Sequence, residues 1–147
     1  MGSDWVYFRS TSRIIASAST PQQSKRGWIS FYGGSHILES SDVHPIKWSV
    51  SQNGVLDVAS DEVSGTLQLY YGTINIRTGT VLMDELEVVR GTLQGYGNTV
   101  AVQHLSITSS SYEREIYNVT MEVHKSLKQT GDRRVLLRIN STIIVKP

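Results

Sequence analysis

Residues 112–145 read YEREIYNVTMEVHKSLKQTGDRRVLLRINSTIIV, and their alternation of apolar and polar side chains decides the fold class. A strand places successive side chains on opposite faces, so apolar residues of one parity build one apolar face. Two such runs flank a polar break at residues 126–132, where Gly131 and Asp132 tolerate the φ > 0 of a turn. The stretch predicts two long antiparallel strands joined by a loop. Their buried residues are expected to be Val119, Met121, Val123, Val135, Leu137, Ile139 and Ile143.

The composition favours a single strand-rich domain over residues 1–147. Charged residues make up 18% of the chain, and Ser, Thr and Gly are abundant. A chain of 147 residues is long enough to bury a core of its own. It contains no cysteine, which excludes disulfides, thiolate metal sites and a cysteine nucleophile.

Short apolar runs separated by turn residues continue through the rest of the chain. Asn53-Gly54 between two such runs predicts a hairpin with a type I′ turn. About nine or ten short strands at regular spacing predict an antiparallel β-sandwich or barrel, with at most one or two short helices. The polar stretch within residues 1–26 is expected to form an extended N-terminal arm.

Two segments of the middle region are nearly identical at an offset of 26 residues. Residues 63–70 read VSGTLQLY and residues 89–96 read VRGTLQGY, and the likeness extends over 63–76 and 89–102. Each copy reads as strand, turn and strand. We therefore expect a repeated hairpin whose copies occupy equivalent positions, with Leu67 and Leu93 both inward. Two copies are too few for a solenoid.

The net charge of +1 hides a strong segregation along the chain. Residues 1–38 carry a net +3, residues 39–122 a net −7 and residues 123–147 a net +5. Basic ends around an acidic middle predict contact with an anionic partner or with a neighbouring subunit. The residues expected to make this contact are Lys125, Lys128, Arg133, Arg134 and Arg138.

Motifs for catalysis, metal binding or cofactor binding are absent from the sequence. There is no Gly-x-Ser-x-Gly elbow, and in Gly33-Gly34-Ser35-His36 the Ser and His are neighbours that a strand would turn to opposite faces. The four histidines lack the spacing of metal ligands, and no phosphate-binding or dinucleotide-binding loop occurs. We expect no enzyme, no metal and no cofactor.

These patterns leave three classes of function open. The first is a self-assembling structural protein of viral matrix or coat-like type, homo-oligomeric, which contacts an anionic membrane surface or nucleic acid through its basic ends. The second is a carbohydrate-binding module that stacks sugars on Tyr70, Tyr71 and Tyr96, and the third is a hydrolase with a dispersed site. No apolar run approaches the ~20 residues of a membrane span and no signal peptide is seen, so we expect a cytoplasmic protein (host cytoplasm or virion if viral).

Overall fold

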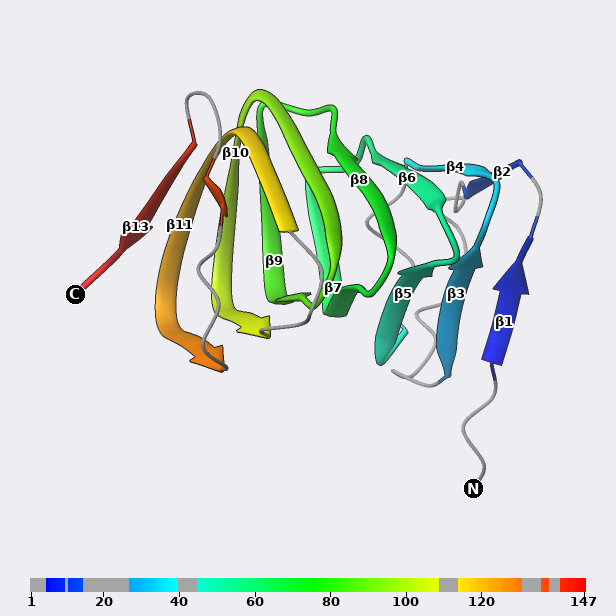
Figure 1. Cartoon of the computed structure of the whole chain (residues 1–147), viewed down its shortest axis with the longest axis horizontal. Coiled ribbons are helices and arrows are strands. Elements are labelled where there is room, and N and C mark those ends of the chain that lie inside the picture. The colour runs from blue at the N-terminus through cyan, green and yellow to red at the C-terminus, as the bar shows by residue number, and fades with distance from the viewer. Residues whose placement is uncertain are drawn as a thin grey trace, which may run out of the picture.

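The computed structural model is a parallel β-solenoid, in which the chain winds in successive coils and each strand pairs with strands of the coils before and after it (Figure 1). The structure describes residues 5–9, 11–14, 27–39, 45–108, 114–130, 136–137 and 141–147. Among these residues every strand pair is parallel and no helix occurs.

Thirteen strands are described, and most of them are short. In chain order they are β1 (Trp5–Phe8), β2 (Ser12–Ile14), β3 (Trp28–Tyr32), β4 (Ser35–Leu38), β5 (Lys47–Ser51), β6 (Gly54–Val58), β7 (Glu62–Leu69), β8 (Gly72–Ile76), β9 (Thr80–Val88), β10 (Gly91–Thr108), β11 (Arg114–Thr130), β12 (Leu136–Leu137) and β13 (Thr142–Val145).

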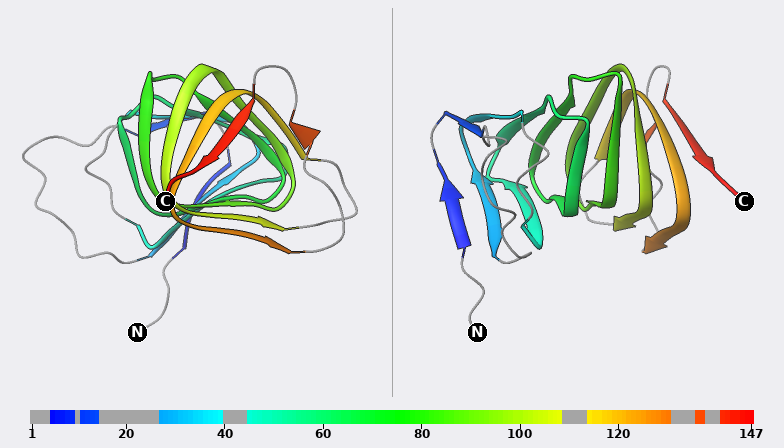
Figure 2. Two further views of the ribbon diagram at one scale, coloured as in Figure 1. Left: turned by 90° about the vertical axis from the view of Figure 1, so that its left-hand side faces the viewer. Right: turned by 180° about the vertical axis from the view of Figure 1, so that it is seen from behind.

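Three stacks of strand runs form the wall of the solenoid, and we call them faces A, B and C. Face A consists of β1, β3, β5 and the second halves of β7, β9, β10 and β11. Face B consists of β2, β4, β6, β8, the first parts of β10 and β11, and β12. Face C consists of the start of β7 and β9, the middle of β10 and β11, and β13. The chain visits them in the order A, B, C, and Figure 2 shows the resulting coil end-on.

Columns of apolar residues, one from each coil, fill the interior. On face A the register runs through two inward columns. The first is Val6, Ile29, Trp48, Leu67, Leu86, Leu105 and Leu127, and the second is Phe8, Phe31, Val50, Leu69, Val88, Ile107 and Gln129. Trp48, Leu67 and Leu86 are fully buried, and each fully buried side chain of this size contributes about 1.5–3 kcal/mol.

At the corner between faces C and A, the alternation of inward and outward side chains shifts by one residue. In β9, Met83 and Leu86 are both buried, so Asp84 and Glu85 are two consecutive outward residues. In β7 the same corner holds Ser64 and Gly65 as an irregularity in the register, and Gly65 adopts a φ of 79° that favours glycine. The carboxylate of Asp84 accepts a hydrogen bond from the Gly65 amide at 2.8 Å, which ties two coils together.

Positive-φ residues also turn the chain from face A to face B at Gln52 and Asn53 (φ 53° and 60°). A turn is therefore present, but its positive-φ residues are Gln52 and Asn53 instead of the expected Asn53 and Gly54, and it does not close a hairpin. β5 and β6 lie on different faces and each pairs in parallel with the coils beside it.

The predicted antiparallel sandwich or barrel is wrong, although the prediction of an all-β chain is confirmed. Alternation of apolar and polar residues occurs in any strand with one buried face, so it does not distinguish parallel from antiparallel pairing. The predicted final hairpin fails for the same reason: β11 continues to Thr130 through much of the expected break, and β13 pairs with it in parallel.

An internal repeat is confirmed, but the repeating unit is a coil and not the predicted hairpin. Leu67 pairs with Leu86 on face A, 19 residues on (86 − 67 = 19), whereas Leu93 pairs with Ile74 on face B. Both leucines are fully buried. The two similar segments nevertheless occupy different faces, so they are not equivalent and the prediction of equivalent positions is wrong.

The residues expected to be buried in the last two strands divide into three groups. Val119, Met121 and Val123 are buried and Ile143 is half-buried. Val135 and Ile139 lie outside the described residues, and of Leu137 only the backbone in β12 is described. At the other end of the chain, β1 and β2 lie within the span expected to form an arm, and they pair with β3 and β4.

Candidate functional site: the two ends of the solenoid

The first inward column of face A is exposed at both of its ends. Leu67 and Leu86, in the middle of the column, have no exposed surface, and Leu105 is 1% exposed. Val6 begins the column and is 49% exposed, and Leu127 ends it and is 43% exposed. The apolar interior along face A therefore reaches the surface on the coils at opposite ends of the molecule (Figure 1).

At the C-terminal end, the exposed leucine lies on a strand edge. β11 pairs with β10 as far as Thr130, but on its other side β13 covers only residues 120–123. Beyond Val123, no described strand of face A pairs with that side of β11. An uncovered strand edge presents backbone N–H and C=O groups that can pair with another strand.

Basic side chains surround this edge. Lys125, Lys128 and Lys146 are all exposed, and Lys128 ends the outward column that contains Ser106 and Glu87. Two of the five residues predicted to contact a partner, Lys125 and Lys128, thus lie beside the edge. The other three, Arg133, Arg134 and Arg138, lie outside the described residues.

The N-terminal end is an aromatic and basic edge made by β1. β1 pairs with β3 on one side, and no described strand pairs with the other. Tyr7 is exposed, and the guanidinium carbon of Arg9 lies 5.7 Å from the centroid of the Tyr7 ring and 5.4 Å from that of Tyr32. Such cation–π contacts hold Arg9 against the end of face A.

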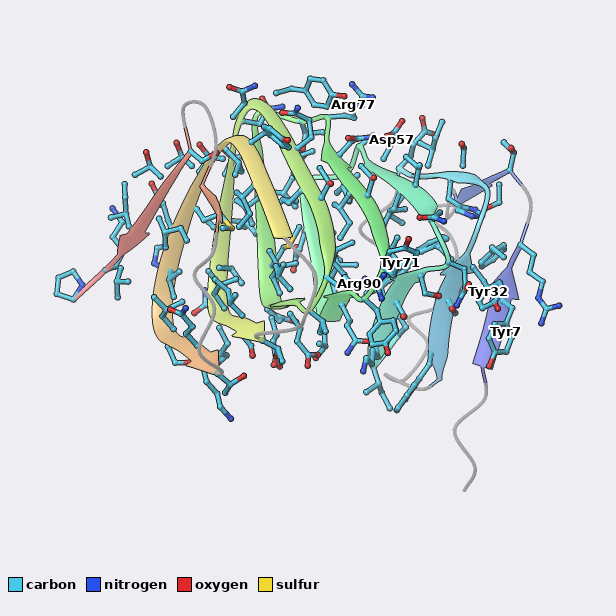
Figure 3. All side chains as sticks on the ribbon, in the orientation of Figure 1. Tyr7, Tyr32, Asp57, Tyr71, Arg77 and Arg90 are labelled. Carbon is cyan, nitrogen blue, oxygen red and sulfur yellow. The ribbon has the colours of Figure 1, made fainter. Side chains whose placement is uncertain are left out.

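The tyrosines predicted to stack sugars are divided between two corners of the solenoid. Tyr70 and Tyr71 precede β8. Tyr96 lies near the other end of β8, at the irregularity of β10 between Gln94 and Asn98, and its ring contacts Arg77. Arg90 covers the Tyr71 ring at 3.9 Å and Arg77 covers the Tyr96 ring at 4.2 Å. Figure 3 shows the Tyr71–Arg90 pair and Arg77 on opposite edges. The structure does not bring the three tyrosines together.

A polar cluster on face B accompanies Arg77. The buried Asn75 donates from Nδ2 to Asp57 Oδ1 at 2.8 Å, and Arg77 Nε lies 3.6 Å from the same oxygen. Asp57 and Asn75 are partners in the register between β6 and β8. The cluster therefore connects consecutive coils, which is a structural use of these charges.

His36 occupies an inward position that the sequence did not indicate. It is 1% exposed and aligns in register with Leu56 in the apolar column of face B. Its Nδ1 lies 2.6 Å from Ser12 Oγ and its Nε2 lies 2.5 Å from the carbonyl oxygen of Gly33. The neighbouring Ser35 is exposed, so these two residues do not form a nucleophile and base pair.

Two acidic residues of the middle region form hydrogen bonds between adjacent coils. Glu85 accepts a hydrogen bond from Thr66 at 3.2 Å and Glu87 accepts one from Gln68 at 3.4 Å, in both cases between adjacent coils. Within the part of the chain that the structure describes, no three His, Cys, Asp or Glu side chains group closely enough to hold a metal ion.

Comparison with known proteins gives no match among family models, curated proteins or solved structures. In the described residues, no helix is long and apolar enough to cross a membrane.

Proposed function

We propose that this chain is a non-enzymatic structural protein that assembles with copies of itself through the ends of its solenoid. The observation that carries the proposal is the 43% exposure of Leu127, a residue of an interior column whose central members are completely buried. Each coil of a solenoid buries its apolar surface against its neighbours, so a terminal coil needs a cover. A second protein strand on β11 provides that cover and satisfies its strand edge.

The energy of one such contact is small. Burying the exposed part of Leu127 contributes about 1 kcal/mol, since complete burial of a leucine contributes roughly 1.5–3 kcal/mol. Backbone hydrogen bonds along a short strand add about 0.5–1.5 kcal/mol each. Association must also offset the loss of translational and rotational freedom. We therefore expect assembly that depends on concentration and reverses on dilution.

Measurement of the molar mass by light scattering across a concentration series tests the proposal. The wild-type mass is expected to rise with concentration, and Leu127→Gln is expected to suppress that rise. Leu82→Gln is the matched control, because Leu82 is 53% exposed and lies on face C in a central coil. A wild-type mass that stays at one chain over the whole series would refute self-assembly.

Binding to anionic vesicles and to DNA tests whether the basic residues contact an anionic partner. If Lys125 and Lys128 serve such a partner, the protein will co-sediment with phosphatidylserine vesicles or bind DNA, and binding will weaken steeply with salt. Lys125→Ala/Lys128→Ala will then weaken binding and its dependence on salt, whereas Leu127→Gln will leave both unchanged.

Carbohydrate binding is the second candidate, and the exposure of two tyrosines favours it. Tyr70 is 51% exposed and Tyr96 is 52% exposed, and exposed tyrosine rings can stack on sugars. Because the two lie at different corners, each would belong to a separate site. Titration of tyrosine and tryptophan fluorescence with oligosaccharides, with Tyr70→Ala and Tyr96→Ala measured separately, tests this candidate.

A further inference from the structure

We propose that the copies stack head to tail, with β1 of one chain pairing in parallel with the exposed edge of β11 in the next. The inference rests on the proposed function and specifies its contact. Its basis is that the two uncovered edges belong to the same face: β1 begins face A and residues 126–130 end it.

The faces also follow one another in the correct order. Within the chain the sequence of faces is A, B, C, and the last described strand, β13, is a face C strand that pairs with β11 at residues 120–123. The position that comes next along the winding is face A, beside residues 126–130. β1 is a face A strand, so a second copy placed there continues the winding without a change of direction.

Backbone hydrogen bonding is complementary at these two edges. In a parallel sheet each interior strand uses one set of N–H and C=O groups towards one neighbour and the alternate set towards the other. In the central coils of face A, the carbonyl oxygen of the inward Val50 accepts from Tyr70 N of the next coil, whereas that of the outward Ser51 accepts from Gly33 N of the preceding coil. Continued to both ends of face A, this alternation leaves the free groups of β11 and of β1 directed away from the molecule at opposite ends. Translation of one copy along the solenoid axis therefore sets the remaining groups of β11 against those of β1.

Continuing the register defines which side chains meet. Val6 of one copy follows Leu127 of the other in the first inward column, so two half-exposed apolar side chains cover each other. Tyr7 follows Lys128 in the adjoining outward column, where the aliphatic part of the lysine side chain can pack on the tyrosine ring beside Arg9. Phe8 follows Gln129 in the second inward column, so only one inward column continues as an apolar one.

A heterologous contact of this kind does not close on itself, so it produces linear filaments one solenoid wide. A two-fold contact between two β11 edges would instead place the strands antiparallel and stop at a dimer. The two arrangements predict different neighbours for Leu127.

Cysteine cross-linking distinguishes them, and the chain has no native cysteine to interfere. Strands of a sheet lie about 4.8 Å apart, which is within the Cα separation that a disulfide spans. Val6→Cys/Leu127→Cys is expected to give a ladder of disulfide-linked oligomers under oxidation, and each single variant is expected to give none. Val6→Cys/Tyr70→Cys is the control, because Tyr70 is equally exposed but lies at a corner of a central coil.

A second pair, Tyr7→Cys/Lys128→Cys, repeats the test on the outward column with two exposed side chains that the interior does not need. Circular dichroism of each variant confirms that its strands are retained. Ladders from both pairs support the inference. Association by light scattering with dimers from Leu127→Cys alone would overturn head-to-tail stacking and leave self-assembly intact. A protein that neither associates nor cross-links would refute both.

Discussion

Gly91 lies directly against Gly72 of the preceding coil, so closely that a Cβ added to Gly91 would be 2.5 Å from the Gly72 carbonyl oxygen. Gly72 stands in the same relation to Gly54. These glycines follow the corner between faces A and B, where the backbones of successive coils approach without room for a side chain.

The first prediction is that Gly91→Ala and Gly72→Ala each lower the free energy of unfolding by about 1–3 kcal/mol, as overpacking does elsewhere. The obstacle is backbone, which cannot rotate away as a side chain does. Gly79→Ala is the control, because nothing lies within 4 Å of its added Cβ. Urea denaturation measures the change, and equal midpoints for Gly91→Ala and Gly79→Ala would contradict the close approach.

The second prediction concerns the interior column of face A. Leu86 is buried between Leu67 and Leu105. Leu86→Ala should leave a cavity and cost about 2–5 kcal/mol. Leu82→Ala, which removes the same atoms from an exposed position of the same strand, should cost less than about 0.5 kcal/mol. Thermal or urea denaturation of the two variants checks the difference, and similar losses would mean that β9 does not face inward as described.

The strand content of this chain could be predicted from its sequence, but the pairing could not. Inward residues recur at a constant interval of 19 in the column from Ile29 through Trp48, Leu67 and Leu86 to Leu105. That interval is the signal of the coil. It is weak because packing requires only an apolar side chain at each position, so the column begins with isoleucine and tryptophan and only its last three members are all leucine.

The strongest identity in the sequence pointed to the wrong period. Gly-Thr-Leu-Gln occurs at residues 65–68 and 91–94, and both segments begin with a glycine at a corner and then alternate between outward and inward side chains. Gly65 lies at a corner between faces C and A, and Gly91 lies at a corner between faces A and B. Similar local requirements thus produced similar sequences on different faces.

The candidate site could be predicted only as a charge pattern. Lys125 and Lys128 were identified because basic residues gather near the C-terminus. Leu127 between them lies in the predicted loop, since a single leucine among polar residues carries no strand signal. Leu127 belongs to an interior column because it pairs in register with Leu105, and only the parallel pairing of β10 and β11 shows this.

The third prediction is that Ser12→Ala destabilises the first coils by about 1 kcal/mol. The substitution removes the hydroxyl that lies 2.6 Å from Nδ1 of the buried His36. Ser35→Ala, at an exposed position beside His36, is the control and should be neutral within about 0.5 kcal/mol. Hydrogen exchange of β2 and β4 amides, followed by mass spectrometry, should show faster exchange in Ser12→Ala only.

The fourth prediction ranks two substitutions in the face B cluster. Asp57→Ala should cost about 1–3 kcal/mol, because it takes the acceptor away from the buried amide of Asn75. Arg77→Ala should cost at most about 1 kcal/mol, since its ion pair with Asp57 is partly exposed and screened by solvent. Urea denaturation at pH 7 gives both values. The reverse order would show that Arg77 stabilises these coils through a contact that does not involve Asp57, such as its packing on the Tyr96 ring.

The fifth prediction concerns how salt affects self-association. Head-to-tail stacking places the exposed Arg9 of one copy beside Thr130 of the next, two residues along the strand from Lys128, so charges of the same sign come close at the contact. Salt should therefore strengthen assembly, because the screening length falls from roughly 30 Å at 0.01 M to about 10 Å at 0.1 M ionic strength.

Reversing two of the charges, in Lys125→Glu/Lys128→Glu, turns the repulsion into attraction. At low salt this variant should associate more tightly than the wild type by about 1 kcal/mol, or roughly fivefold in the dissociation constant. Its association should weaken as salt is added. Lys47→Glu, in the middle of face A, controls for the change in net charge. Sedimentation velocity at 0.01 M and 0.15 M NaCl provides the measurement. Wild-type association that weakens with salt would mean that the basic end contacts an acidic surface instead of the N-terminal end of another copy.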